Sequence, residues 1–115
     1  MDATLARITK YGAKVVLVAI AAPAPSDADG TTNTSNAVDD ASYARLHTID
    51  ARFAERHRDT VTVVDLADQI CRKGPPCPEY VDGLRMRPDG RHFTPAAAAI
   101  EAQWLLPRVV TAVTK

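Results

Sequence analysis

An unbroken run of β-branched and aliphatic residues, Val15 to Ile20, constrains the fold more than any other feature of this sequence. A strand with one solvent-exposed face alternates apolar and polar residues. An unbroken apolar run therefore favours a parallel strand that is buried on both faces. A second run, Val61 to Asp65, has the same character. Residues 41–58 between them have helical spacing, and this order of elements predicts a right-handed parallel crossover. We therefore expect an α/β fold.

Three further helices are expected, over residues 2–11, 66–71 and 95–106. Gly12 suits the position after the first of them, where the backbone often turns left-handed. Thr94 is a good N-cap and Pro95 suits the first turn of the last helix, which Pro107 is expected to end or kink. Leu5, Ile8, Ile100, Trp104 and Leu105 are predicted to face the core from the first and last helices. The helix over residues 41–58 has one apolar stripe, made of Tyr43, Leu46, Ile49, Phe53 and Ala54.

The segment from Ala21 to Asp40 is rich in Pro, Asp, Thr, Asn and Ser, which predicts a long mobile loop. It follows the carboxyl end of a strand, where α/β proteins bind substrates, although such a loop also occurs without any function. Two parallel strands do not make a stable sheet by themselves. We therefore expect that a part of the sheet is missing from this chain.

Length and charge narrow the classes of partner. The chain has 115 residues, enough for one small domain. Fourteen basic residues balance fourteen acidic ones, which gives no reason to expect nucleic acid or an anionic membrane as partner. The longest apolar run, Val15 to Ala22, is much shorter than the roughly 20 residues that cross a bilayer, so no transmembrane segment is expected. The N-terminus lacks the pattern of a signal peptide.

Two cysteines, Cys71 and Cys77, flank a short loop that contains Gly74. A disulfide between them would contribute about 2 kcal/mol and would persist only in an oxidising compartment. Two free thiols in a cytosolic protein are the alternative, and the spacing does not decide between them. Zinc is disfavoured because no second Cys or His pair lies nearby at ligand spacing. No metal or cofactor is expected.

Asp89 and His92 stand three residues apart on a turn that contains Pro88 and Gly90, just before the last helix. On such a turn the carboxylate can fold back and accept the Nδ1 hydrogen of the imidazole, which leaves Nε2 as a base. This is the supporting half of a nucleophile, base and acid arrangement. The simpler alternative is that Asp89 caps a turn and His92 is a surface residue.

The chain resembles the SGNH hydrolases, or GDSL-like esterases, whose last sequence block is a D-x-x-H motif before the C-terminal helix. The residues that carry the resemblance are Asp89-Gly90-Arg91-His92, followed by Phe93-Thr94-Pro95 and an Ala-rich helix. The two strands resemble later strands of that family in order and spacing. The Cys71-x5-Cys77-Pro78 loop resembles SGNH domains fused behind integral-membrane sugar O-acyltransferases. The resemblance spans about residues 4 to 110.

This resemblance implies a partial three-layer α/β/α fold of the flavodoxin-like SGNH type, with its N-terminal half missing. It also implies that His92 is the general base and that Asp89 orients it. The substrate would be an acylated carbohydrate or another cell-envelope ester, at the extracytoplasmic face of the membrane. The family's Gly-Asp-Ser block and its oxyanion-hole Gly and Asn do not occur here. A missing N-terminal half or a membrane acyltransferase domain would have to supply them, so we expect the chain alone to be inactive.

Other polar residues are weak candidates for chemistry. The serines in or beside the polar loop are not on a strand-to-helix elbow, which a strained nucleophile requires; they are Ser26, Ser35 and Ser42. His47 and His57 are expected to be solvated on a helix surface. Two non-enzymatic alternatives remain, namely a truncated remnant or partner-binding α/β fragment, and a small cytosolic domain in which the D-x-x-H spacing is a coincidence.

Overall fold

Two parallel strands lie at the centre of the molecule. The computed structural model describes residues 1–24 and 37–115. Within these residues β1 (Val15–Ala19) pairs in parallel with β2 (Val61–Asp65), in register along their whole length, and neither pairs with a further strand. The predicted α/β class with parallel strands is confirmed.

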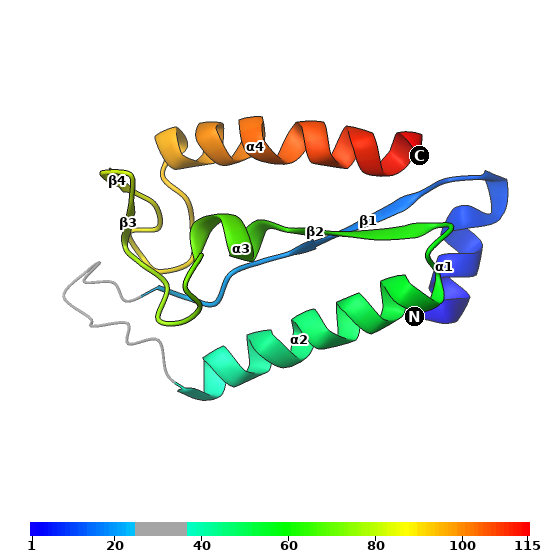
Figure 1. Ribbon diagram of the computed structural model, residues 1–115, viewed down its shortest axis with the longest axis horizontal. Helices are drawn as coiled ribbons and strands as arrows, with labels where there is room; N and C mark the ends of the chain where they lie inside the picture. Colours follow the sequence, from blue (N-terminus) through cyan, green and yellow to red (C-terminus); the bar gives the residue numbers. More distant parts are fainter. Residues whose placement is uncertain (25–36) are drawn as a thin grey trace.

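Helices cover both faces of this two-stranded sheet and make three layers (Figure 1). The long α2 (Ala37–Arg56) joins the strands and lies against one face, beside α1 (Asp2–Ile8) and the 3-10 turn η1 (Thr9–Tyr11). The opposite face is covered by α4 (Pro95–Thr114). The short α3 (Leu66–Ile70) follows β2 directly. No helix among the described residues is long and apolar enough to span a membrane.

Small buried side chains pack at the carboxyl end of the strands. Ala21, Ala22 and Ala24 are buried there against α3 and the first turn of α4. Residues 21–24 have no regular secondary structure, as predicted for the loop over residues 21–40, but they are anchored in the core. The sequence did not reveal this, because methyl groups are too small to mark a core and still fit a tight space. The predicted loop is wrong at its end, since α2 begins at Ala37. Residues 25–36 lie outside the described part of the chain.

The last helix differs from its prediction in two ways. It continues past Pro107 to Thr114, although a proline inside a helix removes one internal hydrogen bond and crowds the carbonyl of the preceding turn. Its inward face is also rotated from the predicted one. Ile100 is 50% exposed, whereas Glu101 is buried. Trp104 is partly buried and packs against the core at the carboxyl end, as predicted. In the other helices, the predicted inward positions of Ile8, Leu46 and Ile49 are wrong, because these side chains are 53%, 44% and 47% exposed.

A short antiparallel hairpin, β3 (Tyr80–Val81) and β4 (Leu84–Arg85), was not predicted. Asp82 and Gly83 form its two-residue turn, and both have positive φ angles, 50° and 79°. An Asp-Gly pair between apolar residues is a strong hairpin signal, so the sequence did contain the information. The hairpin matters because β4 leads into the turn that carries Asp89.

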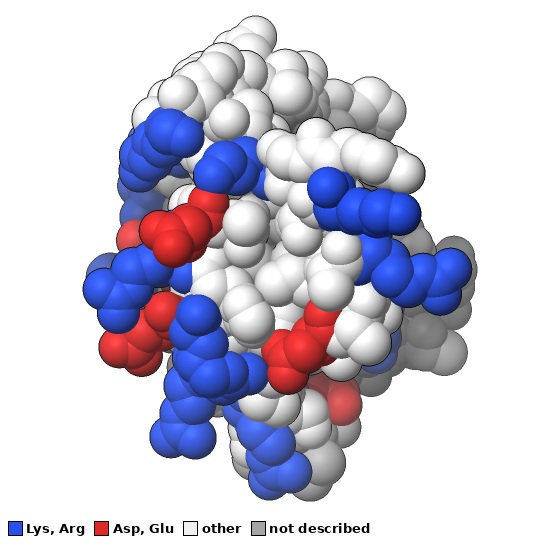
Figure 2. Space-filling model, turned by 90° about the vertical axis from the view of Figure 1, so that its right-hand side faces the viewer, with Lys and Arg blue, Asp and Glu red and all other residues white. Residues whose placement is uncertain are grey.

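Charge is unevenly distributed over this neutral chain. The end of the molecule where both strands begin is rich in Lys and Arg, with fewer carboxylates between them (Figure 2). We call it the basic end, and define it by six exposed residues: Arg7, Lys10, Lys14, Arg56, Arg58 and Lys115. Asp89 and His92 lie toward the opposite end, in the segment that leads into α4.

Candidate functional site

The side chains of Asp89 and His92 form the hydrogen bond that the sequence predicts. Nδ1 of His92 lies 2.5 Å from Oδ2 of Asp89. The other carboxylate oxygen, Oδ1, accepts the backbone N–H groups of Arg91 at 2.8 Å and of His92 at 2.7 Å. Both oxygens therefore accept hydrogen bonds within the turn, which fixes the carboxylate relative to the ring.

Neighbouring segments hold this turn in place. Gly90 adopts a left-handed φ of 79°, and its carbonyl accepts the N–H of Ala24, at the end of the buried segment after β1. On the other side, Thr94 caps α4 by accepting the N–H of Ala97 and donates its own hydroxyl to the carbonyl of Arg85 in β4. The turn is thus tied to the carboxyl end of β1, to the hairpin and to the last helix.

The electrostatics favour an ionised Asp89. The hydrogen bond from the His92 ring, followed by those from the backbone N–H groups of His92 and Arg91, holds the pKa of the Asp89 carboxyl far below its usual range. A carboxylate that stays ionised keeps the hydrogen of a neutral imidazole on Nδ1. The lone pair is then on Nε2, which is the protonation pattern of a general base.

The imidazole of His92 projects into solvent, with 86% of its side chain exposed. Its neighbours Arg91 and Phe93 line a cavity of about 190 Å³, together with Arg87 and Tyr43. A second cavity, of about 230 Å³, lies at the carboxyl ends of the strands and is lined by Asp65, Asp68 and both cysteines, among others. This is the edge of a parallel sheet at which α/β proteins bind ligands.

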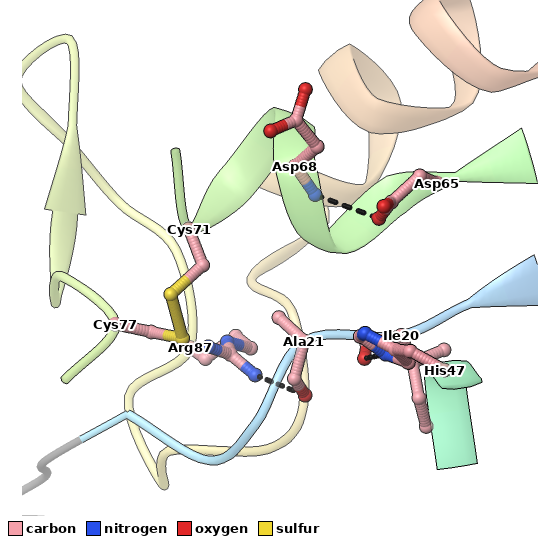
Figure 3. Close-up of a disulfide and its surroundings, with 8 residues drawn as sticks. All are labelled: Ile20, Ala21, His47, Asp65, Asp68, Cys71, Cys77 and Arg87. Carbon is pink, nitrogen blue, oxygen red and sulfur yellow. Dashed lines mark hydrogen bonds between the residues drawn. A yellow bond between two sulfur atoms is a disulfide. The ribbon is translucent and has the colours of Figure 1, made fainter. Parts of the chain in front are cut away.

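Cys71 and Cys77 form a disulfide that closes the loop after α3 (Figure 3). Both cysteines are buried in the core cluster at the carboxyl end of the strands. The sequence spacing left open whether these cysteines form a disulfide or are free thiols, and the structure has the disulfide. Arg87 extends past this disulfide toward the chain after β1 and donates from Nη1 to the carbonyl of Ala21 at 3.4 Å.

Two buried charged residues were not predicted. Arg87 is 4% exposed, and burial lowers the pKa of its guanidinium, an effect that Tyr43 and Asp89 oppose. Glu101 faces the core from α4, and burial raises the pKa of its carboxyl, against the effect of Arg72. Sequence patterns place charged residues outside, so neither residue carries a signal that could have revealed it.

Both helix histidines have structural partners, so the expectation that they are simply solvated is wrong. His47 lies with Nε2 2.7 Å from the carbonyl of Ile20. His57 lies with Nε2 2.9 Å from Oδ1 of Asp2 and packs its ring on Phe53, with 4.7 Å between ring centroids. These contacts join α2 to β1 and to α1.

No serine within residues 1–24 and 37–115 lies on the strand-to-helix turn that a nucleophile would need. Ser26 and Ser35 lie outside the described residues, and Ser42 lies within α2 rather than on a strand-to-helix turn. Among the described residues there is no group of three His, Cys, Asp or Glu side chains that could hold a metal ion. The chain matches no protein-family model, no curated protein and no solved structure. The resemblance to SGNH hydrolases therefore rests on the residues named above.

Proposed function

We propose that this chain supplies the base half of a serine-type acyl-ester hydrolase or O-acyltransferase of the SGNH kind. His92 accepts the proton of a serine hydroxyl as the serine attacks the ester carbonyl, and the acyl group becomes bonded to the serine oxygen while the alcohol leaves with that proton. His92 then activates water or a sugar hydroxyl, which takes the acyl group off again. Asp89 holds the ring and stabilises its protonated form.

The observation that carries this proposal is the Asp89–His92 geometry. The Nδ1 contact, the ionised carboxylate and the exposed ring meet the requirements for a general base presented to a substrate. The imidazole of His92 is not packed in the core, because 86% of its side chain is exposed. The Cys71–Cys77 disulfide supports the further proposal of an oxidising, extracytoplasmic location and a carbohydrate or cell-envelope ester as substrate.

The proposal requires a segment that brings the serine and the oxyanion-hole donors. Two observations favour a partner segment beside the sheet. In the described residues the sheet has two strands, each with one unpaired edge. Apolar side chains flank it without cover, namely Ile20 after β1 and Leu46 and Ile49 on α2, all more than 40% exposed. A larger parallel sheet would bury these groups on both of its faces.

A pair of turnover assays tests the proposal. The 115-residue chain by itself should not hydrolyse a p-nitrophenyl ester, because its base has no nucleophile to activate. The native polypeptide or complex that contains this chain, purified from its source, should carry a Gly-Asp-Ser block and hydrolyse the ester. Mass spectrometry of the native preparation identifies that block.

The His92→Ala variant separates the outcomes. Loss of turnover from the native assembly with unchanged thermal unfolding supports the proposal. Turnover by the isolated chain that His92→Ala abolishes would show that a residue of this chain is the nucleophile and would overturn the need for a second segment. Turnover of the native assembly that survives His92→Ala would overturn the role of His92.

A further inference from the structure

We propose that the basic end of the molecule docks on an anionic phospholipid surface. This inference is independent of the proposed function, because it concerns the opposite end from Asp89 and His92. The net charge of zero had given no reason to expect such a partner. The structure changes this expectation, because basic residues that are far apart in the sequence lie together at one end of the folded chain.

The basic end gathers charge from separate parts of the chain. Parallel pairing brings the starts of β1 and β2 together, and with them Lys14 and Arg58. The last residue of the chain, Lys115, lines the same cavity of about 280 Å³ as these two. The helix and 3-10 turn that precede β1 add Arg7 and Lys10. The end of α2 adds Arg56, which lies near Asp2.

The excess of positive charge at this end is substantial for a small neutral chain. Its six basic residues face three acidic ones on the same segments, which are Asp2, Glu55 and Asp59. Asp2 is already paired with His57. The remaining eight basic and eleven acidic residues of the sequence leave the rest of the chain negative. An anionic membrane attracts the positively charged end of such a molecule. The molecule therefore binds with its basic end toward the lipid headgroups.

Apolar side chains at the same end favour lipid over nucleic acid. Tyr11 is 88% exposed, the highest value among the large apolar side chains exposed in the described residues, and Ile8 on the preceding helix is 53% exposed. The ammonium of Lys10 lies 5.2 Å from the Tyr11 ring. Val113, near the end of α4, is exposed as well. Aliphatic and aromatic side chains among Lys and Arg are typical of proteins that rest in the headgroup region.

In this orientation the long direction of the strands stands away from the membrane. The hairpin and the Asp89–His92 turn, at the other end of the strands (Figure 1), would face the aqueous side. Uncharged surface is visible between the blue side chains of the basic end in Figure 2, and the exposed Ile8, Tyr11 and Val113 belong to the same end.

Vesicle binding by the full chain tests this inference. Sedimentation with sucrose-loaded vesicles of phosphatidylcholine containing roughly a quarter phosphatidylglycerol should show binding at about 0.1 M salt and much less at about 0.5 M. Vesicles of phosphatidylcholine alone should bind far less. The double variant Arg7→Gln with Lys10→Gln should weaken binding about fivefold for each charge removed. Tyr11→Ser should weaken it further with no change in charge.

A matched double variant provides the control. Arg72→Gln with Lys73→Gln removes the same charge from the loop at the opposite end and should bind vesicles as the unmodified chain does. Equal losses in the two double variants would overturn the docking surface. Absence of vesicle binding at low salt by the folded chain would overturn the inference as a whole. Binding to duplex DNA without binding to vesicles would replace lipid with nucleic acid as the partner.

Discussion

The part of the chain that the structure describes contains two Asp–His pairs, which consist of the same chemical groups but differ in position and exposure. Asp2 and His57 are 55 residues apart in the sequence, and their contact joins α1 to the end of α2. Their imidazole packs on Phe53 and is mostly covered, with 29% of the side chain exposed. Asp89 and His92 belong to one turn, and their imidazole is 86% exposed.

This difference indicates what each pair contributes. The ring of His57 is used by the fold, because removing it would leave a gap beside a buried phenyl group. The ring of His92 fills no space in the core, while its carboxylate partner accepts three hydrogen bonds within the turn. A rigidly held base that contributes little packing is the arrangement that a catalytic group requires. We therefore expect substitutions in the two pairs to have opposite effects on activity and stability.

The largest expected effect is on catalysis at the exposed pair. In the native esterase assembly, Asp89→Asn should lower kcat by about 10³-fold or more, because an amide that donates to Nδ1 forces the imidazole hydrogen onto Nε2. Asp2→Asn, the same change in the other pair, should leave kcat unchanged. Steady-state hydrolysis of a p-nitrophenyl ester measures both. Similar losses in the two variants would remove the distinction between the pairs.

The next effect concerns the covalent link at the end that carries the exposed pair. Replacing Cys71 and Cys77 together by Ser should lower the free energy of unfolding by about 2 kcal/mol, because the unfolded loop gains freedom. Urea unfolding with and without a reducing agent measures the change. The reducing agent should reproduce the effect in the unmodified chain and have none in the double variant. A stability that does not respond to either change would show that the link contributes nothing.

A smaller loss of stability is expected at the covered pair. His57→Ala should lower the free energy of unfolding by about 1 kcal/mol, because the ring no longer packs on Phe53. His92→Ala, the matched change in the exposed pair, should alter it by less than about 0.5 kcal/mol. Thermal or urea unfolding of the 115-residue chain distinguishes them. The opposite ranking would mean that the exposed turn is the one that holds the fold together.

Much of the fold was predictable because its signals are local. The unbroken run from Val15 and the later run from Val61 identified the two strands, and Thr94 identified the start of α4. The exact inward face of that helix was not predictable. From the sequence, hydrophobicity was the only basis for deciding whether Ile100 or Glu101 is buried. Which of them is covered depends on where β1, β2 and α3 place neighbouring side chains.

The candidate site divides in the same way. The contact between Asp89 and His92 was predictable because three residues on a turn determine it. Arg87 was not, because its burial depends on the disulfide and on Ala21, which comes from a distant part of the sequence. The contact between Asp2 and His57 was missed for the same reason. The spacing of residues within one turn predicted the contact that forms there. The partners of charged residues that come from distant segments could be identified only from the tertiary structure.

The smallest effect we predict is the pH dependence of the covered pair. The hydrogen bond from His57, and then the positive charges of His57 and Arg56, lower the pKa of the Asp2 carboxyl in the folded chain. A carboxyl whose pKa is lower when folded adds stability above its unfolded pKa, near 3.9, and loses it as the pH falls through the folded value. The deficit in unfolding free energy of Asp2→Asn should therefore be present at neutral pH and vanish in acid. Urea unfolding at about pH 7 and about pH 2.5 measures it, and a deficit that grows on acidification would mean that the protonated form of Asp2 is the one the fold stabilises.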